Sequence, residues 1–163
     1  MSITSPVIEK HPSGFRLVYE DVYATDIRDL WQAITTPERL ARWMVDLTGE
    51  FRAGGTWSVV ADGDEPSWAT GTVTACEAPR SFTTTWHAVG EDPTELTVTL
   101  DDVEGGTRMR LVHTGIRSIF YGAGWQTYLE RLASHIAGKE HPHEWHARFA
   151  ELSPAYEERF GAL

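Results

Sequence analysis

The stretch GWQTYLERLASHI, residues 124–136, has the strongest periodic pattern in this chain of 163 residues. Its apolar residues recur at intervals of three and four, which places them on one face of an α-helix: Trp125, Tyr128, Leu129, Leu132, Ala133 and Ile136. Gly138 follows as the expected C-terminal stop of this helix. Gly122-Ala123-Gly124 is expected to close the loop before it. A helix with such a broad apolar face needs an apolar surface to cover.

The residues upstream of this helix supply such a surface. They form short runs of β-branched and aromatic residues separated by turn residues, which predicts strands at 14–24, 46–52, 56–61, 68–76, 81–89, 96–100 and 107–113. Short turns between consecutive strands favour an antiparallel meander. One of these turns, Asp62-Gly63-Asp64-Glu65, resembles a calcium loop only faintly, because it lacks the length and the later bidentate glutamate.

Two short helices are predicted between the first and second strands. Asp26 is an N-cap candidate, and Ile27, Leu30, Trp31 and Ile34 follow with helical spacing. Thr36-Pro37 starts a second helix, with Thr36 as its cap and proline in the first helical position. The chain is therefore expected to be an α+β protein. A curved antiparallel sheet of about six to seven strands would wrap around the long helix, leaving a cavity between them.

The tail forms an extension of the predicted domain. Residues 1–138 are expected to form the domain, and residues 139–163 a C-terminal helical extension of it. Pro142 and Pro154 would open two short helices there, whose apolar faces are formed by Trp145, Phe149, Leu152, Tyr156 and Phe160. These faces either pack across the domain or form a homodimer contact, because exposed aromatic clusters are unusual on a monomer.

Composition and charge exclude several classes of protein. The formal net charge of −10 repels phosphate backbones and anionic lipids, so we expect neither nucleic-acid binding nor membrane insertion. No apolar run is long enough for a transmembrane helix. One cysteine, Cys76, cannot form an internal disulfide and is expected to be a buried small hydrophobe. Together with the absence of a signal-peptide pattern, this predicts a soluble, cytoplasmic protein.

Several motifs, in order, resemble the family of homologues of the activator of heat-shock-protein-90 ATPase. The opening signature consists of Val22-Tyr23-Ala24, residues 30–38 (LWQAITTPE) and Trp43. Residues 51–57 (FRAGGTW) resemble the family's Phe-x-x-Gly-Gly-x-Trp hairpin. Gly71-Thr72-Val73, Trp86, the Gly106–Gly115 strand motif and Gly124-Trp125-x-x-x-Leu129-x-x-Leu132 follow at matching spacing. The resemblance covers about residues 14–137 and implies a START-like (SRPBCC) domain with the helix-grip fold.

The resemblance also accounts for much of the tryptophan content. The chain has seven tryptophans, and five of them, Trp31, Trp43, Trp57, Trp86 and Trp125, fall on these motifs. Trp68 and Trp145 lie outside them. The leading hypothesis is a small hydrophobic or aromatic ligand bound in a cavity of at least about 150 Å³. Its expected lining is Trp57, Thr84, Trp86, Met109, His113, Trp125, Tyr128, Leu129 and Leu132.

Two other functions remain open. One is an enzyme of the cyclase or hydratase kind, with His113 as the acid or base, because this residue follows Met109 and Leu111 on the inward face of its strand. The alternative for His113 is a structural histidine bonded to a neighbouring group. The other function is a chaperone-interacting module. Neither is excluded by the sequence, and whether the protein is an enzyme stays undecided.

No cofactor or metal is expected. His141, His143 and His146 stand close together, but the spacing of His143 and His146 is i, i+3 and no further ligand is assigned. A solvated helix terminus is the preferred interpretation of this segment.

Overall fold

The computed structural model describes residues 6–61 and 66–163, so the predicted acidic turn at Asp62–Glu65 lies outside the described residues. It has four helices and eight strands in these ranges. In chain order they are β1 (Val7–His11), β2 (Gly14–Tyr23), α1 (Ile27–Thr35), α2 (Pro37–Trp43), β3 (Leu47–Gly49), β4 (Thr56–Val59), β5 (Ala69–Glu77), β6 (Ser81–Ala88), β7 (Thr94–Val103), β8 (Gly106–Ile116), α3 (Phe120–Ile136) and α4 (Trp145–Gly161). The predicted α+β architecture and helix-grip fold are confirmed.

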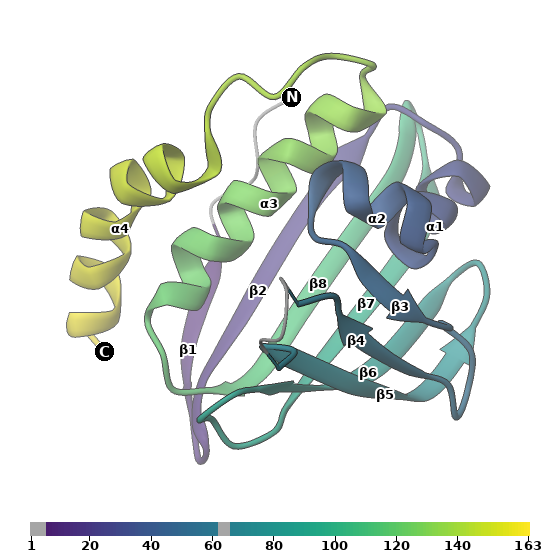
Figure 1. Cartoon of the computed structure of the whole chain (residues 1–163). Helices are drawn as coiled ribbons and strands as arrows, with labels where there is room; N and C mark the ends of the chain where they lie inside the picture. The colour runs from purple at the N-terminus through teal and green to yellow at the C-terminus, as the bar shows by residue number, and fades with distance from the viewer. Residues whose placement is uncertain (1–5, 62–65) are drawn as a thin grey trace.

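The strands form one antiparallel sheet in the order β1-β2-β8-β7-β6-β5-β4-β3. Figure 1 shows α3 lying across this curved sheet, with α1 and α2 beside one end of it and α4 on the outer side of α3. The sheet has one strand more than the upper end of the predicted range. Strand β1 has no clear sequence signal, because two of the five residues in VIEKH are charged and all five are exposed or half-buried. Pairing with β2 in register Val7 to Val18 makes it an edge strand.

Local capping explains why the two short helices begin and end where they do. The Asp26 carboxylate accepts a hydrogen bond from the Asp29 backbone amide at 2.8 Å, as expected of an N-cap. Thr36 precedes α2 but does not cap it through its side chain. Its hydroxyl instead donates to the Gln32 carbonyl at 2.7 Å and therefore closes the end of α1.

The long helix begins earlier than predicted, because α3 already includes Gly122 and Gly124. The prediction of a loop at these glycines is wrong. Gly122 has a packing role, since a Cβ there would lie 2.8 Å from Cε1 of Tyr156 in α4. Its carbonyl also accepts a hydrogen bond of 2.5 Å from the Tyr19 hydroxyl in β2. The other end is as predicted: Gly138 has a φ of +68° just after the helix.

The tail forms one helix, α4, and the prediction of two short helices is wrong. Pro154 lies inside α4 on its exposed side. The carbonyl that proline leaves without an intrahelical donor belongs to exposed Ala150, so water can bond to it. The helix packs against α3 and buries Tyr156 and Phe160. Part of the apolar face is therefore packed within the chain, as the first of the two predicted alternatives requires, and the homodimer contact stays a prediction.

A polar network fastens α4 to the rest of the molecule. The Tyr156 hydroxyl donates to Gln126 at 2.7 Å, and Gln126 donates to Glu130 at 3.0 Å. Glu130 also receives two hydrogen bonds, of 2.7 and 2.9 Å, from the Arg148 guanidinium. These bonds lower the pKa of Glu130 although its partial burial acts in the opposite direction. The network fixes the start of α4, which provides one wall of the site described next.

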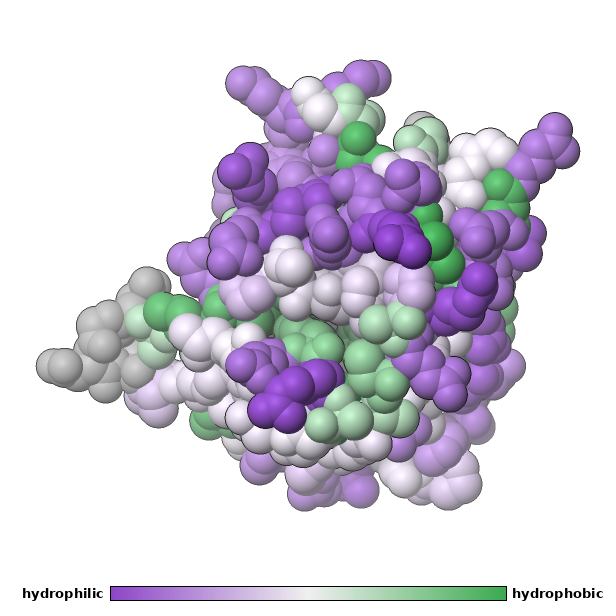
Figure 2. Space-filling model, turned by 90° about the vertical axis from the view of Figure 1, so that its right-hand side faces the viewer, coloured by the Kyte–Doolittle hydropathy of each residue, from purple (hydrophilic) through white to green (hydrophobic). Residues whose placement is uncertain are grey.

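One face of the molecule combines hydrophilic and hydrophobic residues. Figure 2 shows hydrophilic residues around a band of neutral to hydrophobic residues that crosses the middle of one face. No helix in the described ranges is both long and apolar enough to cross a membrane.

Candidate functional site

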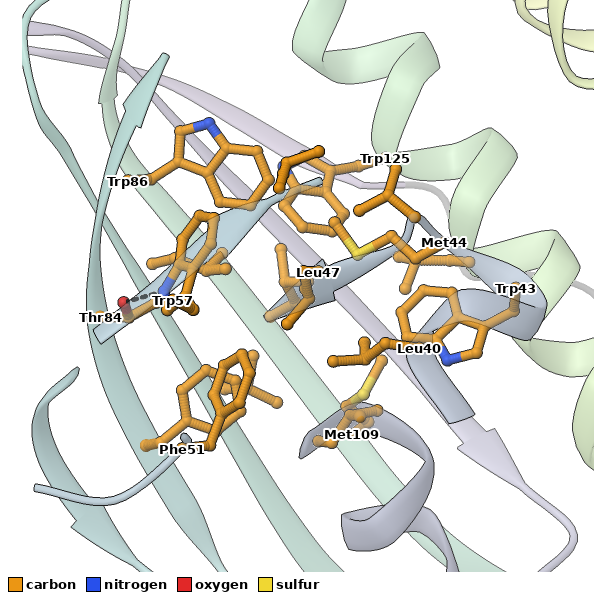
Figure 3. A pocket seen from close by; sticks show the side chains of 18 residues that line it. Leu40, Trp43, Met44, Leu47, Phe51, Trp57, Thr84, Trp86, Met109 and Trp125 are labelled. Atoms are coloured by element: carbon orange, nitrogen blue, oxygen red, sulfur yellow. Dashed lines mark hydrogen bonds between the residues drawn. The ribbon is translucent and has the colours of Figure 1, made fainter. Parts of the chain in front are cut away.

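A small cavity lies in the interior between the sheet, α2 and α3. Figure 3 shows the tryptophans Trp57, Trp86 and Trp125 near one another on one side of it, with Leu47 projecting into the middle. Its lining is almost entirely apolar: Ile34, Leu40, Trp43, Met44, Val45, Leu47, Phe51, Trp57, Val59, Phe82, Thr84, Trp86, Leu96, Val98, Met109, Leu111, Trp125 and Leu129. The hydroxyl of Thr84, the polar exception, accepts a hydrogen bond of 2.8 Å from the Trp57 indole.

This interior cavity is too small for an organic ligand. Its volume is about 50 Å³, compared with the 150 Å³ or so of a void that binds benzene. This interior space alone does not reach the expected cavity volume of about 150 Å³. The side chains of Trp57, Trp86 and Trp125, all buried, occupy the space that a ligand would need.

A second and larger hollow opens beside the interior cavity. This aromatic cleft has a volume of about 480 Å³, and that size falls within the range of small-molecule sites. Its lining consists of Met44, Trp68, Trp86, Ala88, Glu91, Ser118, Phe120, Tyr121, Gly124, Trp125, Tyr128, Trp145 and Phe149. Met44, Trp86 and Trp125 line both spaces and so form the wall between them.

The aromatic rings of the cleft form a continuous series of contacts. The ring centroids of Trp68 and Trp86 are 6.2 Å apart, and those of Trp86 and Trp125 are 5.5 Å apart. From Trp125 the series continues through Tyr128, Trp145, Phe149 and Phe120, with spacings of 6.4, 5.3, 5.1 and 6.1 Å. Segments far apart in the sequence supply these rings: the residue before β5, strand β6, and helices α3 and α4. Such rings offer flat apolar surfaces on several sides of one space.

One carboxylate stands at the edge of these rings. The Trp86 indole donates to the Tyr121 hydroxyl at 3.2 Å, and that hydroxyl donates to Oε2 of Glu91 at 3.2 Å. Partial burial and, next, the Glu91 charge raise the pKa of Tyr121 to about 12, so the phenol stays neutral. Two successive hydrogen bonds therefore connect Trp86 through Tyr121 to the Glu91 carboxylate.

His113 is fully buried behind the cleft, and both of its ring nitrogens are occupied. Nδ1 accepts a hydrogen bond of 3.0 Å from the Trp125 indole, so the ring proton is on Nε2. Nε2 lies 2.7 Å from the Thr94 hydroxyl, which donates in turn to the Trp86 carbonyl at 3.0 Å. Burial lowers the pKa of His113 to about 3. A neutral imidazole with two fixed partners orients the neighbouring rings and has no free nitrogen to act as a base.

Comparison with known proteins agrees with this architecture. The profile of the family described as activator of Hsp90 ATPase homolog 1-like protein matches residues 24–137. The chain belongs to this family. The predicted resemblance is thereby confirmed, and the helix-grip fold is the START-like fold of its structural neighbours. No curated protein matches the sequence.

Solved structures extend the comparison beyond the family motifs. CalU16 from Micromonospora echinospora superimposes with a TM-score of 0.79 at 23% identity, covering 99% of both chains. A protein from Bordetella parapertussis encoded by the gene BPP1335 gives 0.70 at 25% identity, over 98% of this chain and 95% of that one. The Aha1 dimer from Colwellia psychrerythraea gives 0.62 at 20% identity, over 74% and 95%. The match to CalU16 includes α4, which lies beyond the family profile.

The nine residues predicted for the site divide between the two spaces. Six of them line the interior cavity: Trp57, Thr84, Trp86, Met109, Trp125 and Leu129. Tyr128 lines the cleft, and Trp86 and Trp125 line both spaces. His113 and Leu132 line neither space, and both side chains are buried in the protein interior.

Four residues that complete the cleft are absent from the predicted site. Trp68 and Trp145, the tryptophans outside the family motifs, both line it. Glu91 and Tyr121 have no sequence motif that indicates a site. Their convergence depends on how the loop after β6 meets the start of α3, which no local pattern encodes.

The remaining candidates have local partners. His141 bonds to the Arg42 carbonyl at 2.8 Å and His146 to Glu144 at 2.9 Å, while His143 is exposed. In the part of the chain that the structure describes, no three potential ligands are grouped around a metal position. Cys76 is half-buried, and its thiol lies 3.6 Å from the Phe51 carbonyl.

Proposed function

We propose that this protein binds a small hydrophobic or aromatic molecule in the aromatic cleft. The observation that carries the proposal is the convergence of Trp68 and Trp145 on one hollow. They lie 77 positions apart in the sequence, and neither belongs to the family motifs that build the core. Trp68 is 43% exposed, and the Trp145 indole nitrogen has no hydrogen-bond partner among the described residues. Large rings left partly exposed around a 480 Å³ space favour ligand contact over core packing.

The interior cavity has a different role in this proposal. At about 50 Å³ it gives Trp86 and Trp125 a little free space behind their rings. These two side chains form the floor of the cleft and are held by hydrogen bonds to Tyr121 and His113. A ligand would lie on this floor, between the segment before β5 and the start of α4.

The test is a ligand screen with a matched set of exposed-residue variants. A panel of neutral aromatic compounds such as 1-naphthalenemethanol is titrated while tryptophan fluorescence and calorimetric heat are recorded. Trp68→Ala and Phe120→Ala each remove an exposed cleft ring, and we expect each to weaken binding at least about fivefold, since a ring contact contributes about 1 kcal/mol. Val89→Ala, which trims a 68% exposed side chain outside the cleft, serves as the control and should bind normally. Absence of any binding at millimolar concentration would refute the proposal.

A further inference from the structure

The charge at the edge of the aromatic cleft specifies the ligand further. Apart from the rings, the lining has one titratable carboxylate, Glu91, and the described residues contribute no lysine, arginine or histidine to it. Tyr121 occupies one oxygen of this carboxylate, and Oε1 has no hydrogen-bond partner in the described part of the chain. Glu91 is half-buried beside the rings, so its negative charge is less screened than that of a surface residue.

Arg117, which lines the neighbouring polar hollow, contacts other residues. Arg117 lies 4.0 Å from Asp92, the residue after Glu91, and its Nε donates to the Ser13 carbonyl at 3.3 Å. No ion pair within 4 Å joins Glu91 to a described residue. Glu91 lines both the aromatic cleft and the neighbouring polar hollow, whereas Asp92 lines only the polar hollow, together with Arg117. Of the two adjacent carboxylates, only that of Glu91 belongs to the aromatic cleft.

We infer that the ligand carries a cationic amine or quaternary ammonium group on an apolar or aromatic body. This inference rests on the proposed function and adds the charge of the ligand to it. The negatively polarised faces of Trp68, Trp86 and Tyr121 attract a cation, and a carboxylate beside them completes the arrangement that recognises ammonium groups. An anionic ligand would meet the Glu91 charge at close range and a protein of net charge −10 at long range.

The experiment uses three probes of one shape that differ in charge. They are 1-naphthylmethylamine, which is cationic at pH 7, neutral 1-naphthalenemethanol and anionic 1-naphthoate. Isothermal titration calorimetry on the full chain at fixed ionic strength gives the three dissociation constants. We expect the cation to bind at least about fivefold more tightly than the alcohol, and the carboxylate to bind more weakly than both.

Two charge-removing variants locate the source of any preference. Glu91→Gln keeps the shape of the side chain and should reduce the preference for the cation over the alcohol to less than about twofold, measured as the ratio of the two dissociation constants. Asp92→Asn removes the same charge one position away, outside the cleft, and should leave the preference intact. Unfolding curves establish that both variants are folded.

The outcomes separate this inference from the proposed function. If the alcohol binds and the amine binds no better, or if Glu91→Gln leaves the preference intact, ammonium recognition is refuted while the aromatic cleft remains a binding site. If Asp92→Asn abolishes the preference as fully as Glu91→Gln, general electrostatic attraction explains it and the inference is also refuted. If none of the three probes binds at millimolar concentration, the proposed function itself fails.

Discussion

Replacing Gly122 with alanine tests how α4 is placed against α3, which decides whether the aromatic cleft exists as described. The added methyl group would lie 2.8 Å from Cε1 of Tyr156 and closer still to its Cδ1, inside the 3.0 Å that real Cβ atoms keep. Overpacking of this kind costs about 1–3 kcal/mol. Displacing the Tyr156 ring would also weaken its hydroxyl bond to Gln126, which contributes about 1 kcal/mol. The intrinsic gain of alanine in a helix, about 0.5–1 kcal/mol, offsets only part of this.

The net expectation is that Gly122→Ala lowers the free energy of unfolding by about 1–3 kcal/mol. Urea denaturation followed by circular dichroism measures it. Gly124→Ala is the matched control, because the same substitution two residues along the same helix meets nothing within 4 Å. That control should be neutral or stabilise the fold by up to about 1 kcal/mol. Equal effects of the two substitutions, or stabilisation by Gly122→Ala, would show that α4 does not pack where the structure places it.

Three further predictions follow from buried contacts. The folded state keeps the pKa of His113 near 3, whereas the unfolded chain takes up the proton at its usual 6.5. The contribution of neutral His113 to the free energy of unfolding should therefore be fully present above pH 6.5. It should decrease toward pH 3 by on the order of 4 kcal/mol. Urea titrations of His113→Gln should lack this pH-dependent decrease. Thr84→Val leaves the Trp57 indole unpaired and should cost about 1–3 kcal/mol in the same assay, unless Trp57 finds another acceptor. Truncation after Gly138 removes α4 and uncovers the surface that Tyr156 and Phe160 bury. The shortened chain should have a lower melting temperature and should associate, as measured by light scattering. An equally stable monomer would contradict the packing of α4.

Most of the fold could be predicted because its elements satisfy local rules. The Asp26 cap, the Gly138 stop and the alternation along β7 each depend on a few neighbouring residues. The failures occurred where tertiary contacts override local preference. Gly122 was interpreted as a loop residue, although it is glycine because Tyr156 approaches the helix there. The sequence predicts a helix start at Pro154, but this proline lies inside α4, on its exposed side.

The site was less predictable than the fold because inward orientation does not distinguish a cavity wall from packed core. Met109, Leu129 and Leu132 share the same apolar character, yet only the first two line the interior cavity. Whether space is left open depends on the summed volumes of side chains from many elements. His113 shows the same limit: its inward position was anticipated, but its partners Trp125 and Thr94 come from other elements.

The indole nitrogens of the tryptophans separate structural from functional candidates more clearly than burial alone. Four buried motif tryptophans each donate to an internal acceptor: Trp43 to the Ala33 carbonyl, Trp57 to Thr84, Trp86 to Tyr121 and Trp125 to His113. A tryptophan with a fixed internal partner is positioned before any ligand arrives, and two of these four, Trp86 and Trp125, form the floor of the cleft. Trp68 and Trp145, the two tryptophans that complete the cleft lining, make no such bond to a described residue. Replacing either ring therefore leaves no buried acceptor unpaired, and substitutions there should affect binding more than stability.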